Sequence, residues 1–259
     1  MRQLPFVAMG FLVGCDLYVE PDPGPVPDPA ASYTLVPRGN VAALGQIAAV
    51  AWDGSSHWIV TRTEDGDYWD PDRLDIFRYD VATGATSQPI VLTNHWERPT
   101  GAAWVQGQLW IHFDANNSGL VTSLDTATGV ETPRFSVSSG MNDIDTDGQH
   151  LYFAQSSTEA VIEVRDHDNG SIADVLWSEA FQASLRGLGV VQVPGAPAPE
   201  VWGGTLSSNR LAVMIGDETV ASAELPGFGY NLYPLIQFTG QQLTIVESNQ
   251  LYFFDVVRP

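Results

Sequence analysis

The chain contains no lysine and only one cysteine among its 259 residues. All 11 basic residues are arginines, set against 31 acidic residues, so the formal net charge is −20. Proteins that bind nucleic acids use clustered cationic side chains to displace the counterions of the phosphate backbone. This charge balance argues against a nucleic-acid partner and favours solubility, cation association or a basic partner. A single cysteine also excludes a disulfide within the chain.

The one cysteine, Cys15, follows an apolar segment at the N-terminus. Residues 1–14 carry one early charge and then an uncharged, mostly apolar run that is too short to span a bilayer. The run ends Leu12-Val13-Gly14-Cys15, which resembles the lipobox of bacterial lipoproteins. The resemblance implies a lipidated Cys15, a membrane partner through that lipid, and a place in the cell envelope, on the periplasmic side or at the cell surface. The alternative is an incidental cysteine after an apolar start.

The composition then divides the chain into three parts. Residues 1–14 are the expected signal peptide, and residues 15–31 are the lipidated cysteine and a tether. The tether includes the sequence PDPGPVPDP, which is typical of a semi-rigid, extended spacer. Residues 32–259 form the folded domain. Because 44% of the chain is hydrophobic, we expect one large domain with its own core.

A unit of short strands recurs along this domain and is clearest in residues 101–137. One signal is a turn with glycine between two apolar strands, and the gaps between these glycines are 53, 41, 47 and 45 residues. The second signal is an aspartate that ends an apolar strand; three copies are closed by a glycine four residues later, where an Asp side chain can bond the turn amides and glycine accepts a positive φ. The glycines are Gly54, Gly107, Gly148, Gly195 and Gly240, and the aspartates are Asp80, Asp125, Asp166, Asp217 and Asp255.

This period predicts an all-β fold, a five-bladed β-propeller of four-stranded blades. The last unit has only three strands before Pro259, and residues 32–37 form a strand that belongs to no blade. We therefore expect the N-terminal strand to complete the last blade and close the ring, which would remove exposed sheet edges. Six blades are the alternative, with one blade hidden in loops. The Asp-Thr-Gly type of turn resembles that of quinoprotein-like and YVTN-type bacterial propellers, which implies a fold and no particular activity.

Two acidic stretches are candidate metal sites. The sequence Asp143-Ile-Asp145-Thr-Asp147-Gly148 matches the opening of a calcium loop, but Ala154 stands where the bidentate Glu is needed and the flanks are strands. We interpret it as a structural turn. The loop of residues 64–73 is dense in carboxylates and could hold Ca²⁺ as the one possible cofactor. The candidate ligands there are Asp65, Asp67, Asp70 and Asp72.

In a propeller, the loops between the second and third strands of a blade share one face with the connections between blades. The unusual residues of the sequence fall in these loops, where binding residues concentrate. Aromatic rings beside carboxylates and asparagine suit a polyhydroxylated ligand. The alternative is that Trp69 and Trp96 pack between blades and that the acids are simply solvated. The predicted ligand-binding residues are Tyr68, Trp69, Asp70, Asp72, His95, Trp96, Glu97, Arg98, Asp114, Asn116, Arg186 and Tyr230.

Catalysis would need a nucleophile or an acid–base pair aimed at one pocket. Cys15 is assigned to the anchor, and His95 is the one histidine expected on the ligand-binding face. The sequence therefore predicts a monomeric, lipid-anchored binding or scaffold module for a protein or glycan of the cell envelope, and not an enzyme. The alternative is a hydrolase or lyase of an envelope polysaccharide, which a funnel with two convergent carboxylates and His95 would favour.

Overall fold

The computed structural model describes residues 31–43, 45–63, 72–95, 97–115, 118–155, 161–177, 185–205, 209–228 and 235–259. Within these residues the regular structure consists of 20 β-strands and no helix, as the all-β prediction expects. Consequently, the described part of the chain holds no apolar helix of the length needed to cross a bilayer.

Twelve strands form three sheets of four, and in each sheet the strand order follows the sequence. All neighbours in these sheets are antiparallel, as expected for strands joined by short turns. The first sheet contains β2 (Gln46–Trp52), β3 (Ser56–Thr63), β4 (Asp72–Asp80) and β5 (Ile90–His95). The second contains β6 (Arg98–Val105), β7 (Gln108–Ala115), β8 (Ser118–Asp125) and β9 (Val130–Val137). The third contains β10 (Met141–Thr146), β11 (His150–Gln155), β12 (Val161–Asp166) and β13 (Ile172–Trp177).

The other eight strands are hydrogen-bonded in the order β14-β15-β16-β17-β1-β20-β19-β18. We call the first four strands of this order the fourth group and the last four the last group. The fourth group is β14 (Leu185–Val191), β15 (Glu200–Thr205), β16 (Arg210–Ile215) and β17 (Glu218–Glu224). The last group is β18 (Leu235–Thr239), β19 (Gln242–Glu247), β20 (Gln250–Val257) and β1 (Ala31–Ala42).

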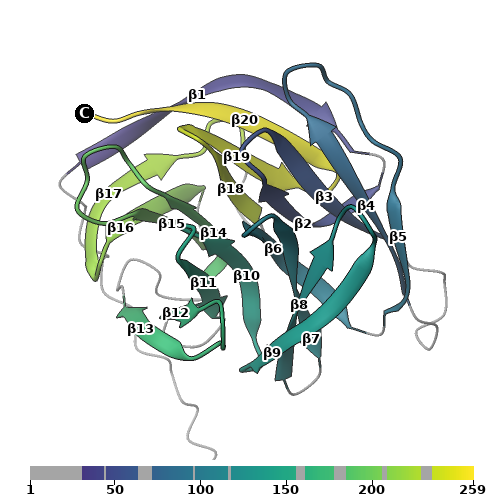
Figure 1. Cartoon of the computed structure of the whole chain (residues 1–259). Coiled ribbons are helices and arrows are strands. Elements are labelled where there is room, and N and C mark those ends of the chain that lie inside the picture. Colours follow the sequence, from purple (N-terminus) through teal and green to yellow (C-terminus); the bar gives the residue numbers. More distant parts are fainter. Residues whose placement is uncertain are drawn as a thin grey trace, which may run out of the picture.

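Strand β1, the first described strand, pairs with two strands from the C-terminal part of the chain. Its first residues, Ala31–Tyr33, pair in parallel with β17, and Thr34–Ala42 pair antiparallel with β20. Figure 1 shows β1 running along the outside of the molecule beside β20. The strand is longer than the expected residues 32–37, because a register shift between Pro37 and Gly39 lets the pairing continue past the point where the apolar pattern ends.

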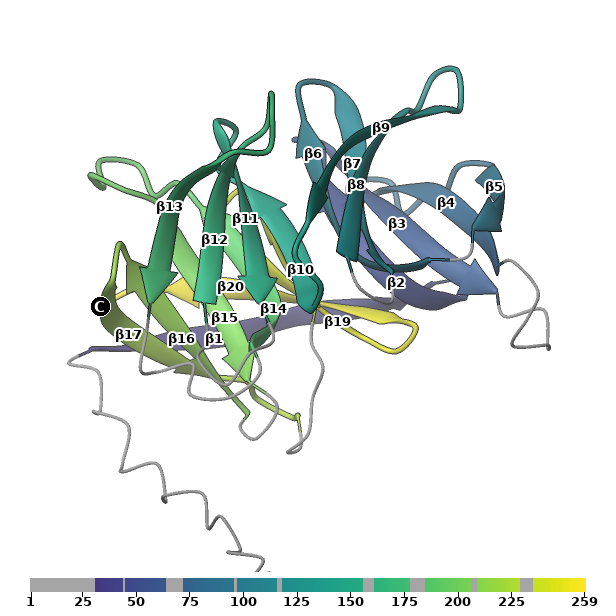
Figure 2. The same cartoon turned by 90° about the horizontal axis from the view of Figure 1, so that it is seen from below.

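The innermost strands of the five groups are β2, β6, β10, β14 and β18. Each contacts the next in this order, and β18 contacts β2. Figure 1 shows them gathered at the centre, with the other strands of each group farther out. In Figure 2 the second and third sheets stand side by side, and each is twisted.

The hydrophobic core is divided into five clusters, and each lies between two neighbouring groups of strands. One cluster holds Trp58 of the first sheet and Trp104 of the second, whose rings stack 5.5 Å apart. Further clusters lie between the second and third sheets, between the third sheet and the fourth group, and between the fourth and last groups. The fifth joins Ile59 of the first sheet to Leu251 of the last group. Burial of apolar area thus stabilises every seam between adjacent groups.

The aspartate turns form for the reason that the sequence suggests. The Oδ1 atom of Asp80 accepts the amides of Ala82 and Thr83, each at 2.9 Å. Gly84 has a φ of 71° and donates its amide to the Asp80 carbonyl at 2.8 Å. The same glycine-to-aspartate bond recurs at Asp125 and Asp166, at 2.8 Å each. These turns are therefore structural elements of the repeat.

One strand prediction was wrong in detail. The fourth strand of the first sheet begins only at Ile90, since the preceding Pro89 has no amide to donate to a ladder. Asp255 was expected to end its strand, yet it lies within β20, where it pairs with Val36. The strand continues because β1 supplies a partner for its last residues.

Candidate functional site

A cavity of about 440 Å³ lies among the N-terminal ends of inner strands. Its volume falls in the range of small-molecule sites, about 300–1,000 Å³. The strands that line it start at the end of the fold where the groups connect to one another, which is the face on which the sequence predicts ligand binding. The described lining residues are Gln46, Ile47, Ala48, Arg62, Arg98, Pro99, Thr100, Asn142, Leu235 and Ser248.

Repeated β-bulges shape this cavity. The register of four inner strands shifts at the same place, near the N-terminal end, and the strands resume pairing at Ala49, Gly101, Asp143 and Gly187. A bulge leaves one residue unpaired and re-aims its side chain. Three of the residues skipped in this way line the cavity, namely Ala48, Thr100 and Asn142. Arg186 is the residue skipped in β14, while β18 pairs regularly from Leu235.

Two arginines line the cavity although the protein is strongly acidic. Its ionisable lining side chains are Arg62, near the end of β3, and Arg98, which begins β6. None of the ten described lining residues is acidic. Both arginines also interact with other groups of the protein.

Neighbouring polar groups hold the lining in place. Asn142 Nδ2 donates to the Leu185 carbonyl at 2.7 Å, which ties β10 to β14. Thr100 Oγ1 lies 2.6 Å from Nδ1 of His112, which is fully buried. Burial lowers the pKa of His112 to about 4, so its ring is neutral near pH 7. The Ser248 carbonyl accepts the amide of Ile47 at 3.0 Å and fixes the hairpin turn of the last group at the rim.

Two buried carboxylates, Asp143 and Asp145, lie on β10 below the lining residue Asn142. Their Oδ2 atoms accept the amides of Leu188 at 2.9 Å and Val190 at 2.7 Å, both on β14. Asp145 Oδ1 also accepts Gln237 Nε2 of β18 at 3.2 Å. Desolvation raises the pKa of Asp145 to about 7, against the lowering effect of these amides, and burial raises the pKa of Asp143 as well. The pair connects three inner strands.

The calcium-like motif continues into a turn whose last carboxylate is also engaged. Asp147 Oδ1 accepts the amides of Gln149 and His150 at 2.7 Å each, and its Oδ2 accepts the Tyr152 hydroxyl at 3.0 Å. Asp53 is engaged in the same way by Ser56 and by Trp58 Nε1 in the first sheet. The motif therefore has a structural explanation that does not involve an ion.

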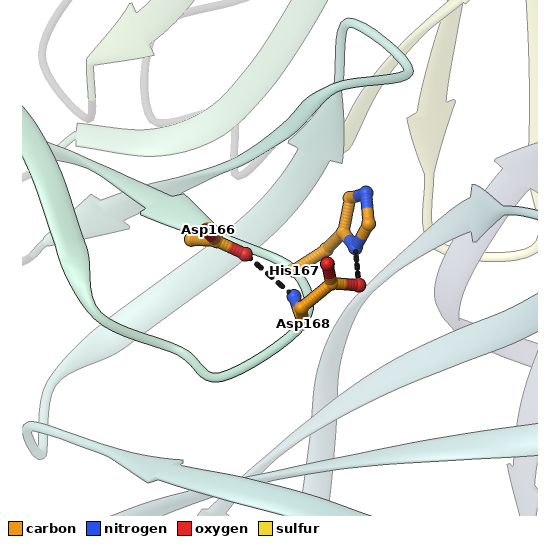
Figure 3. A group of neighbouring side chains, drawn as sticks. All are labelled: Asp166, His167 and Asp168. Carbon is orange, nitrogen blue, oxygen red and sulfur yellow. Dashed lines mark hydrogen bonds and ion pairs between the residues drawn. The ribbon is translucent and has the colours of Figure 1, made fainter.

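A further carboxylate–imidazole cluster lies at the opposite ends of the strands, in the turn between β12 and β13. Asp166, His167 and Asp168 have potential ligand atoms within 4.8 Å of one another. Figure 3 shows that His167 Nδ1 faces Asp168 Oδ1 at 2.8 Å and that Asp166 Oδ1 accepts the amide of Asp168 at 2.7 Å. Asp168 is 77% exposed, and the turn matches those at Asp80 and Asp125. The cluster follows from the turn geometry.

The structure brings some predicted residues together. Arg98 and Asp114 are direct partners across β6 and β7, and Asp72 at the start of β4 is opposite His95. Among the predicted residues that are described with side chains, Arg98 lines the cavity and His95 does not. The residues that lie outside the described part of the chain are Cys15, Asp65, Asp67, Tyr68, Trp69, Asp70, Trp96, Asn116 and Tyr230.

His95 instead lies in the seam between the first two sheets. Its Nε2 atom is 3.1 Å from Glu131 Oε2, and its ring stacks on Phe113 with centroids 4.9 Å apart. Glu97 is partly buried beside it in the chain, between β5 and β6. These contacts give His95 a role in joining the sheets.

Sequence reasoning missed most of the lining, because it searched loops whereas the lining residues stand at strand ends. Bulges cannot be located without the pairing register, so Thr100 and Asn142 could not be recognised by residue type alone. The sequence offered one signal of the lining: Arg62 lies two residues before the acidic loop that was predicted on the ligand-binding face. A second was that Thr100 and Asn142 occupy the same place in successive units.

No family model and no curated protein matches this chain. Among solved structures it is similar to the glutaminyl cyclase of Myxococcus xanthus, with a TM-score of 0.60 and 8% sequence identity. That match covers 88% of this chain and 99% of the other. A chain of a mitotic checkpoint complex has a TM-score of 0.54 at 9% identity, covering 85% of this chain and 95% of that one. Likeness at such low identity shows the fold alone, which is that of a β-propeller.

Proposed function

We propose that this protein is a lipid-anchored, five-bladed β-propeller that binds a protein or glycan of the cell envelope through its central cavity. The cavity carries the proposal, because a pocket of ligand size with convergent polar groups is the usual place for binding in such a fold. The anchor and the envelope location rest on the Leu12–Cys15 motif and the proline-rich tether that follows it.

Five blades and a closed ring are supported by the contacts between groups. The five hydrophobic clusters each join two adjacent groups, including the first and the last. The pairing of β1 with β20 supplies the fourth strand that the last group otherwise lacks. A six-bladed ring would need four further strands, whereas the 20 described strands divide evenly into five groups of four.

Binding is favoured over catalysis by what the polar groups near the cavity already do. A hydrolase would need a carboxylic acid and a carboxylate that reach the substrate. The described oxygens of Asp143 and Asp145 accept amides of the protein, and His95 pairs with Glu131 away from the cavity. The alternative, a hydrolase or lyase of an envelope polysaccharide, rests on the raised pKa values of the two carboxyls. Release of reducing ends or unsaturated ends by the wild type, lost in Asp143→Asn, would establish it.

The binding proposal is tested by capture of purified envelope polysaccharide and of separately purified envelope proteins on the immobilised full chain. We expect capture that Arg62→Gln and Arg98→Gln each reduce at least tenfold. Arg73→Gln is the matched control, because Arg73 pairs with Asp75 outside the cavity. Equal capture by the wild type and both cavity variants would place binding elsewhere and reject the proposal.

The anchor is tested in cells. We expect the full chain to incorporate a labelled fatty acid and to fractionate with membranes, and Cys15→Ser to lose both properties. A Cys15→Ser protein that still carries the label would reject lipidation at this residue. Calcium binding by Asp65, Asp67, Asp70 and Asp72 is tested by melting the protein with and without chelator; an unchanged midpoint would reject it.

A further inference from the structure

We propose that a second, smaller cavity binds a small monocarboxylate, and that Trp110 and Arg134 hold its carboxylate group. This turn-face cavity has a volume of about 260 Å³ and lies between the second and third sheets, at the strand ends opposite the central cavity. The described linings of the two cavities have no residue in common, so this inference is independent of the proposed function. The lining residues are Gln106, Gln108, Trp110, Arg134, His167 and Asp168.

The turn-face cavity is lined by a buried donor that has no acceptor. Trp110 is 5% exposed, and its Nε1 atom has no hydrogen-bond partner among the described residues. The two turns beside it, residues 105–108 and 166–170, lie wholly within the described chain. A buried donor without a partner costs free energy and is rare in native proteins. An acceptor brought by a ligand would remove this cost.

The first sheet shows which group would satisfy this donor. Trp58 is the third residue of β3, as Trp110 is of β7, and its Nε1 atom donates to Asp53 Oδ2 at 3.0 Å. Asp53 precedes its tryptophan by five residues, and Val105 occupies that place before Trp110. The second sheet thus keeps the indole donor and lacks the carboxylate that accepts from it.

The third sheet repeats the arrangement of the first. Tyr152 is the third residue of β11, and its hydroxyl donates at 3.0 Å to Oδ2 of Asp147, which stands five residues before it. Two sheets on either side of the chain's second repeat therefore supply a carboxylate to the aromatic side chain at this position. Because Val105 cannot do so, the acceptor in the second sheet has to come from outside the chain.

An arginine accompanies the indole donor in both the first and the second sheet. Arg78 Nε lies 3.6 Å from Asp53 Oδ2, the oxygen that also accepts Trp58 Nε1. Ser123 of β8 occupies the place of Arg78, two residues before the turn aspartate. Its Oγ atom accepts Arg134 Nε at 2.8 Å. The pairing of β8 with β9 skips Arg134, so a bulge directs this side chain.

The partners of Arg134 are all uncharged. Besides Ser123, they are Gln108 Oε1, 2.7 Å from Nη2, and the ring of Trp110, whose centroid is 5.1 Å from the guanidinium carbon. In the described part of the chain these bonds use Nε and Nη2 and leave Nη1 without an acceptor. They fix the guanidinium over the indole and do not neutralise its charge. A carboxylate beside it would accept a charge-assisted hydrogen bond.

The lining also limits the charge and size of the ligand. Asp168 is an acidic lining residue, but it is 77% exposed and its Oδ1 atom lies 2.8 Å from His167 Nδ1 (Figure 3). Solvent screens an exposed charge, whereas the indole and the guanidinium would contact the ligand directly. Asp168 therefore disfavours a polyanion more than a single carboxylate. The volume lies just below the usual range of small-molecule sites, which favours a ligand of few atoms.

Nitrogen–proton correlation NMR of the full chain tests the inference, with sodium acetate replacing sodium chloride at constant ionic strength. The Nε1–H signal of Trp110 is assigned by its loss in Trp110→Phe. We expect acetate to shift this signal to lower field in a saturable manner, and acetamide, its uncharged counterpart, to bind at least tenfold more weakly. Arg134→Gln should raise the dissociation constant for acetate at least tenfold. Arg78→Gln removes the same charge from the first sheet and should leave that constant unchanged.

Val105→Asp supplies the carboxylate from the chain itself. This variant should shift the Trp110 Nε1–H signal in the same direction as acetate does, and acetate should then have no further effect, because the introduced side chain takes the ligand's place. Val105 is 1% exposed, so circular dichroism must first show that the variant is folded. If it is not, Arg134→Gln decides the question.

Three results would overturn the inference. The first is a Trp110 signal that acetate does not move, or moves without saturation. The second is acetamide that binds as tightly as acetate, since the site would then not recognise the charge. The third is a folded Arg134→Gln protein that binds acetate as tightly as the wild type. None of these results bears on the central cavity, which is tested with other variants and ligands.

Discussion

Arg258, the penultimate residue of the chain, holds Glu200 of β15 with its Nη2 atom 2.7 Å from Glu200 Oε2. The Glu200 carboxylate also accepts the Tyr33 hydroxyl of β1 and Trp202 Nε1, each at 3.1 Å. Glu200 is only 3% exposed. One buried carboxylate therefore joins the first described strand, the last residues and the fourth group.

The first prediction concerns this ion pair. Arg258→Ala should lower the free energy of unfolding by about 3 kcal/mol, because it leaves a buried carboxylate without its cation. Arg38→Ala is the control: the pair of Arg38 with Asp255 is exposed and screened by solvent, so its loss should cost much less. Urea unfolding followed by tryptophan fluorescence measures both. Equal losses would show that the Glu200 carboxylate does not depend on Arg258.

The second prediction concerns the hold of β1 on the core. Leu35 is 6% exposed and belongs to the cluster between the fourth and last groups, whereas its neighbour Val36 is 39% exposed. Leu35→Ala should lower the free energy of unfolding by about 3 kcal/mol, and Val36→Ala by less than about 1 kcal/mol. Urea unfolding of both variants measures the two losses of free energy. A small effect of Leu35→Ala would mean that β1 contributes little to stability.

The third prediction concerns the contact of Gly101 with β10. A β-carbon on Gly101 would lie 2.5 Å from both Asp143 Oδ1 and the amide nitrogen of Ile144. Gly101→Ala must therefore displace one inner strand from the next and should destabilise the fold by about 2 kcal/mol. Gly45→Ala, whose nearest contact would be the Thr61 side chain at 3.3 Å, should cost less. Thermal melts of the two variants compare them, and a larger loss in Gly45→Ala would contradict this account.

The fourth prediction concerns pH. Burial lowers the pKa of His57 and of His112 to about 4, so the unfolded state binds more protons below pH 6.5 and the free energy of unfolding falls with acid. Asp145 acts oppositely: with a folded pKa of about 7, its contribution is complete below pH 3.8 and is lost as the pH rises through 7. Burial also raises the pKa of Asp143, so between pH 4 and 6.5 the two carboxyls oppose the two histidines, and stability should depend weakly on pH.

His112→Gln removes one of the two histidines from this balance. The slope of the unfolding free energy against pH should then change by about −1.4 kcal/mol per pH unit within that window, the value for one proton. His57→Gln should change the slope by the same amount. Urea unfolding at pH 4.5, 5.0, 5.5 and 6.0 gives the slopes. A substitution that lowers the free energy of unfolding equally at every pH leaves its slope unchanged. Unaltered slopes in both variants would mean that these histidines are charged when buried.

Much of the fold was accessible from the sequence, because glycine and aspartate turns leave a mark that does not depend on tertiary contacts. The turns at Asp80 and Asp125 form from bonds within five residues, and they set the period of the repeat. The end of β20 was predicted less well, since Asp255 continues in a strand only because β1, more than 200 residues away, pairs with it.

The candidate site was less accessible. Three of its lining residues stand at bulges, and a bulge at Thr100 or Asn142 is defined only by the partner strand. Arg98 was predicted to bind ligand because it follows the aromatic residue Trp96 in the connection between two blades. The cavity that it lines together with Arg62 played no part in that prediction. The two arginines belong to different sheets, so the sequence does not show that they line the same cavity.

Strand β1 also has a mechanical consequence. A pull on the chain before Ala31 acts along the length of β1, whose residues Thr34–Ala42 are bonded to β20. Such a force shears the whole ladder at once instead of opening its bonds one after another. If Cys15 is fixed in a membrane, drag on a bound glycan reaches the domain through this strand. The strand that joins the two ends of the chain is thus also suited to resist extraction under tension.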